Sequence, residues 1–368
     1  MGQKQIAHSE EFQKKVLQWK FYILYNQIYK MKYDLNQSYS NLKEVDGYQD
    51  VKEININIKK DYNFGLEGAI GIQQGLSYFK EIQMLSLVLG KNNKINDSVT
   101  KILGQTVGNC QSLINLNLVI EQNNIQNGII ELLNPIQNCL NLQSLKLLIG
   151  NQNQVKDQLL ISLGLILRNL TYLNDFGLIV EEGNFITQSG LTYFSEGLKT
   201  CQQLFKFEII FGKDELSTEG LLALKSGIGA LQKLSHFAIE TGPWNCIQSN
   251  GCLQISNTLF QLKQIQQIRI CIDMGNQISD EGVKYLSIAI LSQLQLIKLS
   301  ITFGRFNKIG YQSFYLFFKS LIGCKNLLHL ECYLFCTGNG ILSQQRINLQ
   351  IKLNHIKQLV SKNLRLIW

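Results

Sequence analysis

The feature that most constrains this chain is a repeat whose period stays between 29 and 31 residues over ten copies. Each copy opens with an apolar residue, here named its anchor, and the anchors are Val51, Ile82, Leu113, Leu142, Leu173, Leu204, Leu234, Ile265, Leu296 and Leu327. A fixed period of this length predicts one strand-and-helix unit per copy. The 368 residues would otherwise suggest two or three domains, but a stacked array grows in one dimension and stays a single domain.

One copy, residues 265–295, shows the pattern clearly. Apolar and polar residues alternate from Ile268 to Ile272, which predicts a strand that begins at the anchor Ile265 and buries one face. A polar turn follows at 275–277, Ser279 is a candidate N-cap, and an amphipathic helix comes next. One strand and one helix cannot cover each other's apolar faces, so the unit requires copies of itself on both sides.

Apolar residues also stand six and ten residues before nearly every anchor. Positions four residues apart share one face of a helix, so each helix is predicted to pack on the strands through this face. Strands stack at about 4.8 Å whereas packed helices need about 8–10 Å, so the array must curve with its strands inside. The sequence therefore predicts an α/β solenoid, a horseshoe with a parallel β-sheet on the concave face and α-helices on the convex face.

The repeat resembles the leucine-rich repeat of the long, ribonuclease-inhibitor-like type. The resemblance rests on LINLNLVIEQNNI from Leu113, LQSLKLLIGNQNQV from Leu142 and IQQIRICIDMGNQI from Ile265, each a strand pattern followed by an Asn-rich turn, and it covers residues 45–340. The repeat is slightly longer than usual, and the turn at 213–216 lacks the Asn. The array also resembles ciliate leucine-rich-repeat arrays. The resemblance implies a non-catalytic scaffold that binds proteins.

The flanking segments are predicted separately. Residues 1–44 form an N-terminal cap or a degenerate first repeat, and the sequence does not separate the two. Residues 45–340 form the repeat domain, and residues 341–368 form a basic cap helix followed by a short strand, with five Lys or Arg and no acid. The basic face is either a solvated cap surface or a contact for an acidic partner. Pro135 falls inside a predicted helix, which it should shorten or kink.

Composition and motifs point away from several functions. No apolar run approaches the ~20 residues of a membrane span, no signal peptide is visible, and nine cysteines without paired spacing indicate a cytoplasmic, reducing compartment. The tripeptide Asp175–Gly177 spells a kinase motif, but the rest of a kinase signature is missing. Cys324, His329, Cys332 and Cys336 are of the types that bind zinc, yet two of them fit inward repeat columns. We therefore predict no catalysis, no cofactor, no metal, no small-molecule substrate and no membrane contact.

The concave face carries two signals. Its predicted charged residues are Glu53, Glu121, Asp175, Glu181, Glu208, Glu240, Asp273 and Glu331 against Lys59, Lys146, Lys206, Arg269 and Lys298, a mildly acidic set. Nucleic acid requires a concentrated basic surface, so the excess of +8 is predicted to lie on the convex side and the ends. An aliphatic row, six residues after the anchors, is formed by Val88, Val119, Leu148, Ile179 and Ile210.

A contiguous aliphatic row on a solvent face usually marks a partner site. The same pattern would also arise if the strands ended earlier and these side chains tucked under the turns, or if an N-terminal segment folded across them. Trp244 interrupts the seventh repeat on a loop, 241–245, and is either a local plug or an exposed anchor for a partner.

The predicted function is thus a scaffold that binds protein partners through the concave face and the array ends, as a subunit of a larger assembly of the cytoplasm, for which the cilium or axoneme is a candidate. The alternative is a regulatory repeat protein, either GTPase-activating or a ubiquitin-ligase substrate receptor.

Overall fold

The computed structural model describes residues 51–213, 215–335, 343–354, 356 and 359–367. Strands and helices alternate along this part of the chain. The strands are β1 (Glu53–Ile58), β2 (Met84–Leu89), β3 (Asn115–Ile120), β4 (Ser144–Ile149), β5 (Asp175–Val180), β6 (Lys206–Phe211), β7 (His236–Thr241), β8 (Gln267–Ile272), β9 (Lys298–Phe303), β10 (His329–Phe335) and β11 (Ser361–Ile367). The helices are α2 (Gly65–Leu76), α3 (Asp97–Gly108), α4 (Gly128–Leu133), η2 (Asn134–Asn138), α5 (Gln158–Leu167), α6 (Gln188–Leu198), α7 (Thr218–Gly229), α8 (Gln248–Gln261), α9 (Asp280–Leu291), α10 (Tyr311–Leu321) and α11 (Ser343–Asn354).

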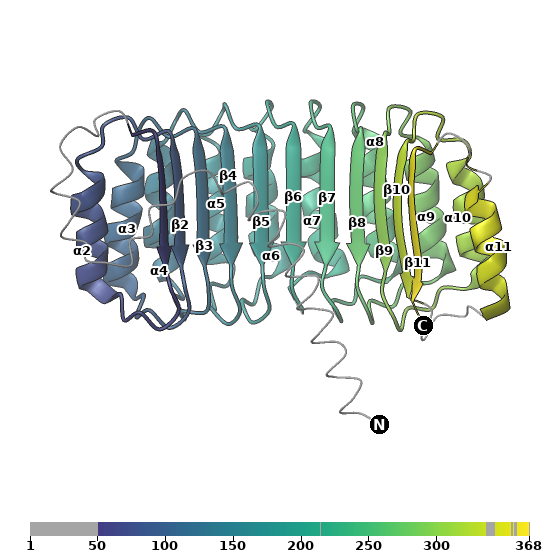
Figure 1. Cartoon of the computed structure of the whole chain (residues 1–368), viewed down its shortest axis with the longest axis horizontal. Helices are drawn as coiled ribbons and strands as arrows, with labels where there is room; N and C mark the ends of the chain where they lie inside the picture. Colours follow the sequence, from purple (N-terminus) through teal and green to yellow (C-terminus); the bar gives the residue numbers. More distant parts are fainter. Residues whose placement is uncertain (1–50, 214, 336–342, 355, 357–358, 368) are drawn as a thin grey trace, which may run out of the picture.

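All eleven described strands join one parallel sheet in the order β1 to β11. The described helices lie together behind this sheet, and their row extends beyond the strands at both ends, so the strand side is concave (Figure 1). The predicted α/β repeat solenoid is confirmed. The domain boundaries at residues 44 and 340 stay a prediction, and the N-terminal cap or degenerate repeat lies outside the described residues.

The strands begin two residues later than predicted. The anchor Leu113 is buried, but its N–H donates to Cys110 O in the turn that leaves the preceding helix. Backbone hydrogen bonds to the preceding repeat start with Ile114, whose N–H donates to Gln83 O just before β2. The anchor therefore contributes its side chain to the core before its backbone has joined the sheet.

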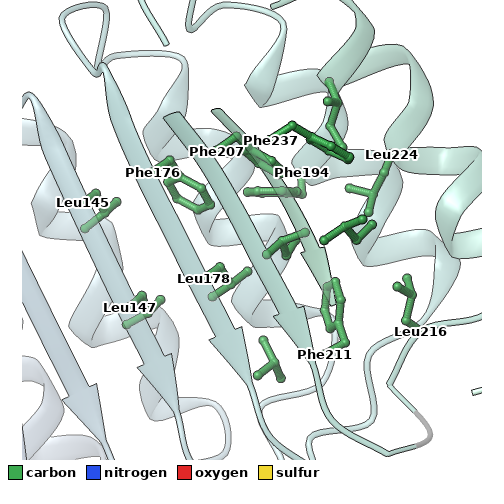
Figure 2. Packing of buried hydrophobic residues seen from close by; sticks show 14 of the residues in the cluster. Leu145, Leu147, Phe176, Leu178, Phe194, Phe207, Phe211, Leu216, Leu224 and Phe237 are labelled. Atoms are coloured by element: carbon green, nitrogen blue, oxygen red, sulfur yellow. The ribbon is translucent and has the colours of Figure 1, made fainter. Parts of the chain in front are cut away.

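The core lies between the sheet and the helices. Phe176, Phe207 and Phe237 occupy the same inward position on β5, β6 and β7, with ring centroids 5.9 Å and 6.5 Å apart and nearly parallel planes (Figure 2). Phe194 on α6 closes on Phe176 from the helix side, with its centroid at 5.6 Å. Identical spacing puts identical side chains in contact, so each repeat is sealed by its neighbours.

Two sequence expectations about the helices can be compared directly with the structure. Pro135 ends α4 after six residues and the chain continues as the 3₁₀ segment η2, as predicted from the missing N–H of proline. The N-cap of α9 is Ser279. The seventh repeat, however, is not the irregular one that its sequence suggests, because β7 keeps six residues and pairs in full register with β8.

Candidate protein-binding face

Three outward columns of strand residues form the concave face. The fifth residue of each strand makes the column that contains Val88, Val119, Leu148, Ile179 and Ile210, and these positions are direct Cα partners across β2 to β6. Four of them form a hydrophobic cluster of their own, apart from the main core, with Val88 packed against it. We name these five residues the aliphatic row. Its position on the face opposite the described helices is as predicted.

The side chains of the aliphatic row are far less exposed than a row on a solvent face would be. Val119, Leu148, Ile179 and Ile210 are only 5–7% exposed. Early strand ends do not account for this, since β2 to β6 run through the row. An N-terminal segment lying across the row would consist of residues 1–50, which fall outside the described residues.

A hollow of about 380 Å³ opens beside the aliphatic row and reaches Ile179 and Ile210. Its remaining lining mixes apolar residues with polar and charged ones, among them Lys146, Asp175 and Arg269. The hollow thus places an apolar edge next to an ionic floor. That is a usual combination for a protein contact, in which apolar anchors supply affinity and charged groups supply orientation.

The charges of the concave face neutralise one another. Lys146 pairs with Asp175, and Lys206 Nζ lies 4.0 Å from the second oxygen of that carboxylate. Arg269 pairs with Glu208, and its Nε is 3.2 Å from Glu240 Oε1. The mildly acidic face predicted by counting is therefore mostly internally paired.

Two of the acids predicted on this face hold the backbone of neighbouring turns. Glu121 and Glu181 accept the backbone N–H groups of Lys91 and Asn151 in the turns of the preceding repeats, at 3.2 Å and 3.1 Å. Each carboxylate thereby joins two adjacent turns. Neither group is a free charge for a partner in the way that the count of acids implies.

Small residues make room for the ion pairs. Gly177 lies on β5 between Lys146 and Glu208, and a Cβ there would stand 2.7 Å from Lys146 Cδ. Ala238 on β7 separates Glu208 from Arg269, which reaches across it. Burial of the Lys146 amine lowers its pKa to about 8, against the opposing pull of Asp175. The long side chains of Lys146 and Arg269 are therefore held close to the sheet and do not extend into solvent.

Trp244 is packed locally and is also half exposed; its contact with a partner stays a prediction. Its ring packs over Gly275, where any Cβ would overlap the indole, and it stacks on Phe306 with centroids 6.4 Å apart. It nevertheless remains 47% exposed, and Phe306 is 44% exposed. The two aromatic residues stand two repeats apart, and Gly275 occupies the equivalent position between them. The pair is a fixed, half-exposed aromatic surface on the loops that follow β7 and β9.

A ladder of mostly buried turn residues fixes those loops. It is built from Asn93, Asn123, Asn153, Asn184, Glu215, Asn245, Asn276 and Asn307. Every asparagine of the ladder donates its side-chain amide to backbone carbonyls of nearby turns; Asn93 Nδ2, for instance, donates to Gly90 O at 2.8 Å. Most rungs also accept a backbone N–H from the preceding repeat, as Asn123 Oδ1 does from Asn93 at 2.8 Å. Seven rungs are visible in the sequence as the Asn of the repeat.

The eighth rung is Glu215, in the turn that lacks the Asn. Its carboxylate accepts the N–H groups of Asn184, Phe185 and Ile186 at 2.6–3.1 Å. Burial nevertheless raises the pKa of Glu215, even though these hydrogen bonds oppose the shift. The sequence signal for this role is positional only: an acceptor side chain at the ladder position of an otherwise regular repeat.

Four cysteines stand three residues before an anchor, and they behave as small apolar residues. Cys139, Cys201 and Cys324 are buried and Cys110 is partly buried against the core. Burial raises the pKa of the Cys110 and Cys201 thiols to about 11 and that of Cys139 to about 12. Among the residues that the structure describes, no three His, Cys, Asp or Glu side chains gather as a metal site; Cys336 of the candidate zinc set lies outside them.

The excess positive charge, predicted on the convex side and both ends, is concentrated toward one end of the chain. Residues 282–368 contain eleven Lys and Arg and a single acid, Glu331, so this segment carries +10 while the whole chain carries +8. Residues 1–281 are correspondingly slightly acidic. Counting charge repeat by repeat reveals this concentration, whereas counting one strand face at a time does not.

The parallel strands, the one-sided helices and the asparagine ladder together define a leucine-rich-repeat solenoid. No helix in the described ranges is both long and apolar enough to cross a bilayer. No family model and no curated protein matches the sequence. Among solved structures, the chain is similar to a leucine-rich-repeat protein of Leptospira interrogans at 14% identity; the match covers 90% of this chain and 100% of that one with a TM-score of 0.25. A score this low adds nothing to the assignment, which rests on the geometry above.

Proposed function

We propose that this protein is a non-catalytic scaffold that binds protein partners through the concave face of β2 to β6 and through the ends of the array. The observation that carries the proposal is the aliphatic row, an apolar cluster separate from the core on the face that the described helices leave uncovered. An apolar cluster outside the core of a solenoid is expected to mark a binding site, because the core does not require it.

The ionic floor supports the same function. Lys146, Asp175 and Arg269 are held in defined positions beside the row, so a partner meets a preorganised charge pattern. Preorganised side chains lose little conformational freedom on binding, which raises affinity for a partner of matching charge. We place the protein in a reducing compartment such as the cytoplasm, on the strength of its buried thiols. Membership of a larger, ciliary assembly is part of the proposal.

The test compares partner recovery between variants of the full-length chain. Leu148→Asp with Ile179→Asp should remove proteins that co-purify in stoichiometric amount with the tagged wild type. Because these side chains are nearly buried, a milder pair, Leu148→Thr with Ile179→Thr, uses the residue that Thr302 supplies in the same column of β9. Circular dichroism and thermal unfolding confirm that each variant is folded.

A matched control is Tyr193→Asp, which places a charge on the exposed helix side of the array. It should keep the partners that the row variants lose. If folded row variants retain all partners in wild-type amounts, the concave site is wrong. The regulatory alternative is distinguished by stoichiometry, since a GTPase-activating or substrate-receptor protein would hold one client transiently while a subunit co-purifies in fixed ratio.

A further inference from the structure

An exposed aliphatic surface lies at the edge where the last strands begin, far from the aliphatic row. It consists of Leu291, Leu294, Ile297, Ile322, Leu328 and Val360, named here the strand-start patch. Leu294 and Val360 are 81% and 76% exposed, and the remaining four are 36–41% exposed. Exposure of this degree on several neighbouring large aliphatic residues is unusual for a surface without a partner.

The residues of the patch lie on adjacent segments of the chain. Leu328 N–H donates to Ile297 O at 2.9 Å and Val360 N–H donates to Leu328 O at 2.8 Å, so these three residues are consecutive rungs at the start of β9, β10 and β11. Asn326 Nδ2 donates to Leu294 O at 2.8 Å, which joins the two adjoining loops. A Cβ on Gly323, beside Ile322, would lie 2.7 Å from Leu291 Cδ1. The six residues are therefore neighbours at one edge of the array.

The column that supplies three residues of the patch is mostly polar in the earlier repeats. The position that holds Ile297, Leu328 and Val360 is polar in most earlier copies, where it is Lys52, Gln83, Gln143, Asn174, Ser235 and Gln266. Ile114 and Phe205 are the exceptions, and each stands alone between two polar copies. The repeat fold therefore does not need an aliphatic residue there. Successive repeats have an aliphatic residue at this position only toward the end of the array that also holds the excess positive charge.

Basic residues flank the patch. Lys298 follows Ile297, Lys325 precedes Leu328 by three residues and Lys362 follows Val360 by two, and both Lys325 and Lys362 are exposed. Glu331, the one acid of residues 282–368, is engaged with Lys298 at 3.8 Å. Two copies of the patch placed face to face would bring these cations together, so self-association through it is disfavoured. The complement is an acidic, aliphatic partner.

The dimensions indicate the shape of that partner. Three rungs of a sheet span about 10 Å, two steps of about 4.8 Å. In an α-helix, residues i and i+7 are separated by about 10.5 Å and lie on one face together with i+3 or i+4. We propose that the strand-start patch binds an acidic amphipathic helix of a partner protein, which inserts aliphatic residues against Ile297, Leu328 and Val360 while its carboxylates meet Lys325 and Lys362. This inference extends the proposed scaffold function to a second surface of defined chemistry.

The test uses synthetic helical peptides and the full-length chain. A peptide with Leu at i, i+3, i+4 and i+7 and Glu at its remaining helical positions should bind, while the same peptide with Ser in place of Leu should bind at least about tenfold more weakly. Leu328→Ser with Val360→Ser should weaken binding of the Leu/Glu peptide by about the same factor. Lys325→Glu with Lys362→Glu should weaken it as well and should improve binding of a Leu/Lys peptide.

Matched controls lie on the same molecule. Tyr172→Ser removes an exposed aromatic residue from a strand-start loop of an earlier repeat, and Lys101→Glu with Lys233→Glu reverses two exposed charges elsewhere; both should leave binding unchanged. The proposal is overturned if no peptide binds, if the patch variants bind like wild type, or if duplex DNA or phosphatidylserine vesicles bind more tightly than the Leu/Glu peptide. Leu148→Thr with Ile179→Thr should not affect peptide binding, so failure of the concave site and failure of this patch give different results.

Discussion

The first and second halves of the concave face share one backbone and differ in what they present. From β2 to β6, the fifth strand position is aliphatic, whereas β7 to β11 place Glu240, Cys271, Thr302, Tyr333 and Arg365 in the same column. The inward columns remain apolar in both halves. The difference teaches that the repeat specifies its core strictly and leaves its outer column open to variation, which is where binding specificity can be encoded.

The largest expected difference between the halves is in stability. Leu148→Ala should lower the free energy of unfolding by about 2–3 kcal/mol, because it removes methyl groups packed between Val119 and Ile179. Thr302→Ala, in the same column of β9, should cost less than about 0.5 kcal/mol. Denaturant unfolding measures both values. Equal costs would mean that the aliphatic row is not a packed cluster.

A second comparison concerns the loops. Gly275→Ala should cost about 2 kcal/mol, since the residue has φ +69° and its new Cβ would displace the Trp244 ring from Phe306. Gly65→Ala, at φ +51° with nothing within 4 Å, should cost only about 1 kcal/mol for the backbone conformation. Unfolding curves give the costs, and Trp fluorescence should change only in the Gly275 variant. An unchanged emission spectrum would contradict the aromatic pair.

The boundary between the halves is expected to respond to pH through Glu215. Its pKa is raised in the folded chain from the ordinary value of 4.5, so its contribution to stability is present below about pH 4.5 and is lost as the pH rises through the folded pKa. The loss amounts to about 1.4 kcal/mol for each unit by which the pKa is raised. Glu215→Asn, the residue at the remaining rungs, should remove this part of the pH dependence. Parallel stability–pH profiles for the variant and the wild type would show that Glu215 does not contribute to the pH dependence.

The smallest expected effect is at Lys146. Its pKa falls from 10.5 to about 8 on folding, so stability present above pH 10.5 is lost as the pH falls through about 8. Lys146→Met should therefore raise stability at pH 7, by less than about 1 kcal/mol because the pair with Asp175 is lost as well. Lys298→Met, whose side chain is 44% exposed, should change stability by less than about 0.5 kcal/mol. A loss of stability in Lys146→Met would show that the ion pair with Asp175 contributes more than the burial of the amine costs.

The sequence predicts the fold because its signal is periodic. Spacing alone identifies the sheet, the side occupied by the helices and the strand position of Leu148 and Ile179. The start of each strand depends on whether Leu113 gives its N–H to a turn or to the sheet, which a pattern of side chains does not reveal. The low exposure of the aliphatic row is equally absent from the pattern.

Contacts between side chains of different repeats are the second part that the sequence does not supply. Glu215 replaces the asparagine found at the other rungs because its carboxylate is buried in the turn and accepts backbone N–H groups there. Arg269 reaches Glu208 because Ala238 is small, a relation between residues 61 positions apart. Such relations depend on three-dimensional packing, in which a missing side chain matters as much as a present one.

Trp244 with Phe306 and Arg269 with Glu208 each connect a repeat to the next but one. A solenoid in which each repeat contacts only its immediate neighbours can bend at every interface between repeats. A contact between repeats that are two apart couples the bending at two successive interfaces. The repeats from β6 to β9 should therefore be stiffer than the repeats before them. If a partner requires the curvature of the array to change, most of that change should then occur in the repeats before β6.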